Sequence, residues 1–148
     1  ANAYDPQRRQ YSSVEVLRAL NGIVPQNGFR LLGVTEEDLF IPMLSFVFGQ
    51  AQVNGKLAVI SLARLRQEFY GLGANGALLL ARSTKEAVHE IGHTFGLTHC
   101  SDPSCPMSLS NSIRQVDDKG DELCKNCLVM LEEYTKHIRT GNGPGEKQ

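Results

Sequence analysis

The residues best able to carry chemistry are gathered in one stretch of the chain. All four cysteines lie between positions 100 and 127, and three of the four histidines lie between positions 89 and 99. Imidazole nitrogen and thiolate sulfur are ligands that zinc favours in proteins. In a chain of 148 residues, this clustering predicts metal binding within residues 89–127.

His89, Glu90 and His93 form the pattern His-Glu-x-x-His. On an α-helix each residue advances by about 100°, so the two histidines lie about 40° apart on one face and can both reach one zinc ion. Glu90 lies about 60° from His93, too far round the helix to be an equal ligand. It can instead contact a metal-bound water and act as general base on it. The pattern therefore predicts a hydrolytic zinc site.

Gly96 and His99 extend this pattern. Glycine permits the chain to leave the helix through a conformation that is costly for other residues. Such a turn would bring His99 back towards His89 as a third ligand, with one position on the ion left open for water. The alternative is a solvated helix face that carries His and Glu by chance. The length of the match favours the zinc site.

The cysteines form two short-spaced pairs, Cys100 with Cys105 and Cys124 with Cys127. Four thiolates suit one tetrahedral zinc ion, and such a closed site is structural rather than catalytic. The alternative is two disulfides. Because the chain does not open with the charged and then apolar segments of a secretion signal, we favour the zinc site. The sequence thus predicts two Zn²⁺ ions per chain, one catalytic and one structural.

Taken together, these residues resemble the zinc-binding motif of the archaemetzincins, a subgroup of the metzincin metallopeptidases. The matching pattern is His89-Glu90-x-x-His93-x-x-Gly96-x-x-His99-Cys100, then Cys105-x-Met107, then Cys124-x-x-Cys127. Weaker likeness extends over residues 5–13 and 46–65. The resemblance implies zinc-dependent hydrolysis of peptide bonds, with a peptide or protein as substrate.

The resemblance also assigns a role to Met107. It implies that Met107 is the Met-turn residue, with its thioether beneath the metal-bound imidazoles. On the residues alone, an ordinary core methionine is the commoner role. The resemblance further implies a strand and a helix ahead of Ala1.

Several elements are expected to precede the metal-binding motif. Residues 1–10 are polar and predict an extended lead-in. Ser12 and Glu15 have the spacing of a capping box, which predicts a helix that ends at Asn21-Gly22, where we expect a left-handed conformation. Residues 29–34 predict a short strand.

Two strands, at residues 44–52 and 57–62, are predicted to form an antiparallel hairpin. Asn54-Gly55 lies between them, and we expect both residues to adopt positive φ. Residues 44–52 would then be an antiparallel edge strand that binds an extended peptide through its backbone. The alternative is an ordinary edge strand without that role.

The second half of the chain predicts helices on either side of an irregular segment. Residues 75–97 predict a long helix, with a second capping pattern at Ser83 that allows a break. Residues 102–120 are expected to be irregular, 121–139 to form an amphipathic helix, and 140–148 to fray. His137 has no partner at metal spacing, so we expect an exposed helix residue without a role.

These elements predict a mixed α/β fold. We expect a metzincin-like twisted sheet with an antiparallel edge strand, a backing helix, an active-site helix, and a C-terminal helical subdomain joined by the cysteine zinc. Residues 1–148 are interpreted as one catalytic domain. Its α/β part, 1–99, ends in the zinc-binding motif, and its cysteine-rich part is 100–148.

Composition limits the possible partners. Fifteen Lys and Arg against sixteen Asp and Glu leave a formal net charge of −1, which does not indicate binding to nucleic acid or to an anionic membrane. No apolar run approaches the roughly 20 residues that a membrane span needs. We therefore expect a monomeric cytoplasmic protein.

A second functional class stays open at this point. The chain could be a zinc-stabilised interaction module with a silent or regulatory His site, in which Glu90 would be dispensable. An intact Glu90 favours the enzyme, since a purely structural site does not need a carboxylate beside its open position.

Overall fold

The computed structural model describes residues 2–24, 26 and 29–139, with the side chains of 137–139 left out. His137 lies in the predicted helix, but its expected exposure concerns a side chain that is left out, and the tail 140–148 lies outside the described residues. In chain order the elements are β1 (Tyr4–Asp5), β2 (Gln10–Ser12), α1 (Ser13–Asn21), β3 (Leu31–Thr35), β4 (Leu39–Phe40), β5 (Gly49–Ala51), β6 (Leu57–Ser61), the 3₁₀ helix η1 (Gln67–Tyr70), α2 (Gly76–Thr94), α3 (Ile113–Asp118) and α4 (Lys125–Arg139).

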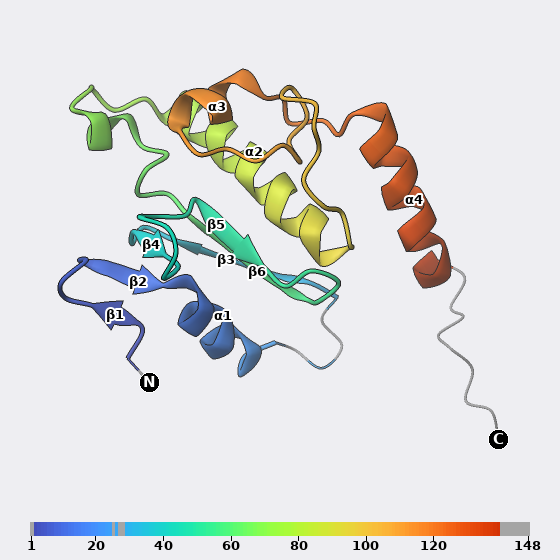
Figure 1. The fold of residues 1–148 in the computed structure, drawn as a ribbon, viewed down its shortest axis with the longest axis horizontal. Coiled ribbons are helices and arrows are strands. Elements are labelled where there is room, and N and C mark those ends of the chain that lie inside the picture. The colour runs from blue at the N-terminus through green and yellow to red at the C-terminus, as the bar shows by residue number, and fades with distance from the viewer. Residues whose placement is uncertain (1, 25, 27–28, 140–148) are drawn as a thin grey trace.

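A three-stranded sheet of order β3-β6-β5 lies at the centre, between α1 on one face and α2 on the other (Figure 1). All five residues of β6, Leu57 to Ser61, are buried. A strand covered on both faces is expected to be a continuous apolar run rather than alternating, as Leu57 to Ile60 are. The predicted mixed α/β class is confirmed, since β3 runs parallel and β5 antiparallel to β6.

A second small sheet, of order β1-β2-β4, was not expected from the sequence. The predicted extended lead-in contains β1 and β2, which pair antiparallel, and β2 pairs in parallel with β4. Strands of two or three residues are too short for a hydrophobic alternation to be recognised.

The predicted hairpin is present, but its turn is different from the prediction. Asn54 adopts a φ of 57°, whereas Gly55 is not among the described residues with positive φ. Asn54 N–H donates to the carbonyl of His93 on α2, at 3.1 Å, so packing on the helix shapes this loop. Gly55 is needed for space, because a Cβ there would lie 2.5 Å from Cβ of Gln52.

The edge strand is also shorter than predicted. Only Gly49–Ala51 of the expected residues 44–52 form β5, and Val47 makes an isolated bridge to Leu39. Residues 44–46 lie outside any strand. Val47 packs against the core cluster of Leu39 and Leu57, whereas Phe46 and Phe48 belong to a second cluster with Leu65 and Val116.

Helix boundaries follow the predictions with some corrections. Ser12 caps α1 by accepting from Glu15 N–H, as expected, but Gly22 ends it at φ −73°, in the right-handed region. The option of a break at Ser83 was wrong, because Ser83 Oγ donates to the carbonyl of Leu79 within a continuous helix α2.

The C-terminal part holds more helix than the sequence indicated. The segment predicted to be irregular, 102–120, contains α3, and α4 begins only at Lys125. α4 contacts the rest of the protein through a buried cluster of Leu97, Cys105, Met107 and Cys127, against which Leu131 packs. None of the described helices is both long and apolar enough to cross a membrane.

Candidate active site

Helix α2 presents His89, Glu90 and His93 from its last two turns. Asn75 caps the start of the helix by accepting from Leu78 N–H at 3.0 Å. At the other end Gly96 adopts a φ of 102°, and a Cβ there would lie 2.5 Å from Oδ1 of Asn54. Only glycine meets both conditions, and the turn that follows it carries His99 back beside the helix.

The three histidines converge. The ring centroids are 4.7 Å apart for His89 and His93, 5.3 Å for His89 and His99, and 5.0 Å for His93 and His99. One ring nitrogen from each lies within 4.8 Å of the others. The Nε2 atoms of His89 and His93 are 3.1 Å apart. Two nitrogens on one tetrahedral zinc at about 2.0–2.1 Å would be about 3.3 Å apart. The residues therefore fit a shared zinc ion.

Hydrogen bonds orient two of these rings. Nδ1 of His89 lies 2.7 Å from the carbonyl of Pro106, and Nδ1 of His93 lies 2.7 Å from the carbonyl of Leu97. Because a carbonyl can only accept, each Nδ1–H donates and each Nε2 keeps a free lone pair. Burial lowers the pKa of His89 to about 3 and also lowers the pKa of His93 and of His99. The rings are therefore neutral, the form that binds a metal.

Glu90 is 5% exposed and lines the same cleft as the histidines. It packs against Gly49 of β5, where a Cβ would lie 2.9 Å from Cγ of Glu90 and 2.6 Å from the carbonyl oxygen of Val59. Burial, together with the charge of Glu86, raises the pKa of Glu90 to about 8. Gly49 was not identified from the sequence, although an isolated glycine in a strand pattern can indicate a close approach of this kind.

Met107 is fully buried and lies against α2. A Cβ at Gly92 would come within 2.5 Å of Sδ of Met107, so the helix can accept the thioether only at a glycine. The carbonyl of Met107 also accepts from Cys100 N–H at 2.9 Å. The residue thus links the helix that carries two of the histidines to the start of the cysteine-rich part.

The four cysteines form a second cluster, with Sγ atoms all within 4.8 Å of one another. All four are free, and Sγ of Cys100 lies 3.8 Å from Sγ of Cys124. A disulfide would require about 2.05 Å, whereas two thiolates on one tetrahedral zinc at about 2.3 Å are about 3.8 Å apart. Three Sγ atoms also accept a backbone N–H at 3.5 Å, as thiolate ligands commonly do. The arrangement fits a four-thiolate zinc better than a disulfide pair.

A cleft of about 600 Å³ runs past the histidines. Residues 44–51 and Val53 line one side, residues 109–111 line another, and Glu86 joins Glu90 and the three histidines. β5 is the edge strand of its sheet and lies along this cleft. An extended chain in the cleft could therefore reach both the histidine cluster and a strand edge.

A buried ion pair supports the site and was not identified from the sequence. Lys119 Nζ lies 3.1 Å from Oε1 of Glu86 and donates to the carbonyl of Ser108 at 3.2 Å. Glu86 is 3% exposed and Lys119 is 2% exposed. Burial raises the pKa of Glu86, and the Lys119 ammonium opposes that rise. The pair ties the segment just after Met107 to α2.

Comparisons with known proteins agree with this geometry. Residues 5–133 match the model of peptidase family M54. The archaemetzincin of Methanocaldococcus jannaschii is 50% identical over 92% of this chain and 74% of its own. The crystal structure of the archaemetzincin of Methanopyrus kandleri has a TM-score of 0.83 and 44% identity, over 90% of this chain and 71% of that one. A zinc-dependent peptidase of Methanocorpusculum labreanum has a TM-score of 0.83 and 36% identity, over 87% of this chain and 78% of that one.

The Glu86–Lys119 pair gives a test of how the site is held. Lys119→Met should lower the free energy of unfolding by about 3–5 kcal/mol, because it leaves a carboxylate buried without its counter-ion. Adding Glu86→Leu should recover most of that loss, since no unpaired buried charge then remains. Urea denaturation of the zinc-loaded proteins measures both effects.

The control is Arg18→Met, which breaks the more exposed Arg18–Glu15 pair on α1 and should change stability far less. If Lys119→Met unfolds like the parent protein, the buried pair does not hold this region together.

Proposed function

The chain belongs to peptidase family M54, with the archaemetzincins, and is a zinc metallopeptidase; from this premise we propose that His89, His93 and His99 hold the catalytic zinc and that Glu90 is the general base. The observation that carries the proposal is the convergence of three histidine nitrogens within 4.8 Å beside a buried carboxylate in one cleft. The competing interaction module would give that carboxylate no role, and membership of a peptidase family favours the enzyme.

The histidines contribute charge and orientation. Zinc, when bound, would supply a water whose pKa is lowered towards about 7 and would polarise the scissile carbonyl. Three neutral imidazoles leave the full double charge of the ion available for this chemistry. The carbonyls of Pro106 and Leu97 hold the rings of His89 and His93 in the required tautomer.

Glu90 moves the proton. In its ionised form, the carboxylate of Glu90 accepts a proton from the attacking water while the water oxygen forms its bond to the carbonyl carbon of the substrate. The same carboxyl group then delivers that proton to the amine nitrogen as the carbon–nitrogen bond breaks. Gly49 keeps space beside Glu90 for this exchange, since a Cβ at that position would lie 2.9 Å from Cγ and 3.1 Å from Oε1 of Glu90.

An extended peptide is the substrate form that we propose for this cleft. β5 lies along the cleft and pairs with β6 on one edge only. A substrate backbone can therefore pair with the other edge of β5. Backbone pairing of this type gives affinity that does not depend on the substrate sequence. Selectivity then comes from the side chains that line the cleft.

The cysteine cluster is proposed to hold a second, structural zinc. It would join the segment after His99 to the start of α4, and His99 is followed directly by Cys100. The free thiols are also consistent with the reducing cytoplasm that we propose as its location. With two sites, each monomer would hold two zinc ions.

Metal analysis tests the stoichiometry. Protein purified without chelator should contain two zinc ions per chain, and a chelator should remove one of them much faster. The histidine site opens to the cleft, whereas four thiolates close the other site. Elemental analysis with thiol titration measures this. A single ion, or two disulfides under anaerobic handling, would contradict the cysteine assignment.

Glu90→Gln should separate metal binding from chemistry. We expect kcat to fall by about 10²–10⁴-fold, because the general base is removed, while zinc content and fold stay unchanged. The assay is digestion of a peptide library with zinc measured on the same samples. Glu132→Gln, at an exposed carboxylate of α4, is the matched control and should keep full activity. Loss of zinc from Glu90→Gln would instead identify Glu90 as a ligand.

Replacing Cys124 and Cys127 by Ser together should destabilise the whole active site. A structural zinc can contribute on the order of 10 kcal/mol, comparable to the net stability of many domains. We expect a large fall in melting temperature and weaker zinc binding at the histidines, although neither residue belongs to that cluster. Unchanged melting and unchanged histidine-site affinity would show that the cysteines are no scaffold.

A further inference from the structure

One wall of the cleft is built without a strand. We call residues 42–48, between β4 and β5, the wall segment; its residues 44–48 line the cleft. Its own backbone bonds include Leu44 N–H to the carbonyl of Ile41 and Val47 N–H to the carbonyl of Leu39. The carbonyl of Phe48 accepts from Ser61 N–H at 2.8 Å. The carbonyls of Pro42, Leu44 and Ser45 accept from side chains instead. Those side chains therefore help to position residues 42–45 of the wall segment, while backbone bonds hold Val47 and Phe48.

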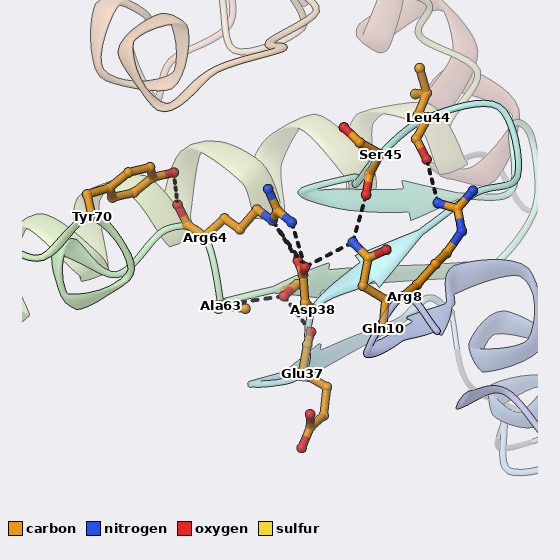
Figure 2. Close-up of polar contacts among 10 residues, drawn as sticks. Arg8, Gln10, Glu37, Asp38, Leu44, Ser45, Ala63, Arg64 and Tyr70 are labelled. Carbon is orange, nitrogen blue, oxygen red and sulfur yellow. Dashed lines mark hydrogen bonds and ion pairs between the residues drawn. The ribbon is translucent and has the colours of Figure 1, made fainter. Parts of the chain in front are cut away.

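Arg8, in the turn between β1 and β2, and Gln10, in β2, supply these donors (Figure 2). Arg8 donates to the carbonyl of Leu44 at 3.0 Å and to that of Pro42 at 3.3 Å. Gln10, which is 4% exposed, donates from Nε2 to the carbonyl of Ser45 at 2.7 Å and to Oδ2 of Asp38 at 2.9 Å. Both partners of Gln10 are acceptors, so its amide is the donor that joins them.

Asp38 connects this contact to the apolar lining. Arg64 binds it with two nitrogens, Nε to Oδ1 at 2.9 Å and Nη2 to Oδ2 at 2.8 Å. The same guanidinium lies 4.2 Å from the ring centroid of Phe46, which meets Phe48 edge-on at 5.1 Å. A bidentate pair has little rotational freedom, so the position of Asp38 is passed on to the Phe46 ring.

The cleft favours one kind of side chain. Its apolar lining comprises Leu44, Phe46, Val47, Phe48, Ala51, Val53 and Leu109. Apart from the histidines, Glu86 and Glu90 are its ionisable residues among those the structure describes, and neither lysine nor arginine lines it there. An acidic substrate side chain would lose its hydration against this apolar lining, whereas an apolar one can leave water against the aromatic wall.

We propose that Gln10, Asp38 and Arg64 are positioning residues for the wall segment, and that this wall selects peptides with an apolar side chain. The inference rests on the proposed peptidase function and names the substrate class of that same cleft. Gln10 is the most informative member because its side chain, rather than the strand ladder, bonds the wall carbonyl of Ser45.

Binding without cleavage gives the first measurement. The probes are two fluorescein-labelled alanine octapeptides that differ at one central residue, leucine in one and glutamate in the other. Fluorescence anisotropy on the zinc-loaded Glu90→Gln protein should show the leucine probe bound about tenfold more tightly. Adding Phe46→Ala should remove most of that preference.

The positioning role is tested by Gln10→Met, which keeps the side-chain length and removes the amide. In the Glu90→Gln background this substitution should weaken binding of the leucine probe about five- to tenfold. With Glu90 intact, KM should rise by the same factor while kcat stays unchanged, because Gln10 is not part of the catalytic cluster. Gln7→Met, the same change at an exposed position of the β1–β2 turn, should leave both values unchanged. Should Gln10→Met fail to fold, Arg64→Lys replaces it, with Arg66→Lys at the more exposed Glu36 pair as control.

The outcomes separate this inference from the function on which it rests. Equal affinity for the two probes, or an unchanged affinity in Gln10→Met, overturns the inference. If the protein still cleaves other peptides in that case, the proposed peptidase function stands. Absence of both binding and cleavage for every peptide tried overturns the two together. A raised KM with a constant kcat, seen in Gln10→Met and not in Gln7→Met, supports the positioning role.

Discussion

The left-handed turn at Gly96 is the constraint on which both clusters depend. It ends α2 at a φ of 102° and leaves no room for a side chain beside Asn54. Leu97, which follows, is 1% exposed in the core and offers its carbonyl to Nδ1 of His93. Two residues later the chain reaches His99 and then Cys100. A change at this turn would move a proposed ligand of each zinc ion at once.

Close packing around α2 is the second requirement of the site. Gly49 admits the carboxylate of Glu90 from the side of the sheet, and Gly92 admits the thioether of Met107 from the C-terminal part. Interiors packed at crystal-like density cannot absorb an added methyl group at such contacts without displacement. The helix is thus held on two sides by contacts that only glycine permits. This preorganises the histidines before a metal or a substrate arrives.

Buried and partly buried polar pairs hold the segments that lack regular structure. Glu86 and Lys119 join the chain after Met107 to α2, and Asp38 with Arg64 and Gln10 joins the wall segment to the two sheets. Buried ion pairs contribute little net stability compared with apolar contacts, yet they are costly to break by removing one partner. They are well suited to select one conformation for a loop. Both pairs lie at the borders of the same cleft, where loop position determines what can bind.

The sequence by itself determined the seven His and Cys residues that the structure gathers into two clusters, the helix that presents His89 and His93, and the antiparallel hairpin ahead of it. These features depend on helical spacing, on capping and on turn residues, all of which act over a few neighbouring positions. Tertiary structure alone decided the sheet of β1, β2 and β4, the course of residues 42–48, and the contacts of Gly49 and Gly92. It also decided the pairing of Glu86 with Lys119. Each of these features depends on residues that lie far apart in the chain and on how their side chains pack together. A local sequence pattern does not contain that information.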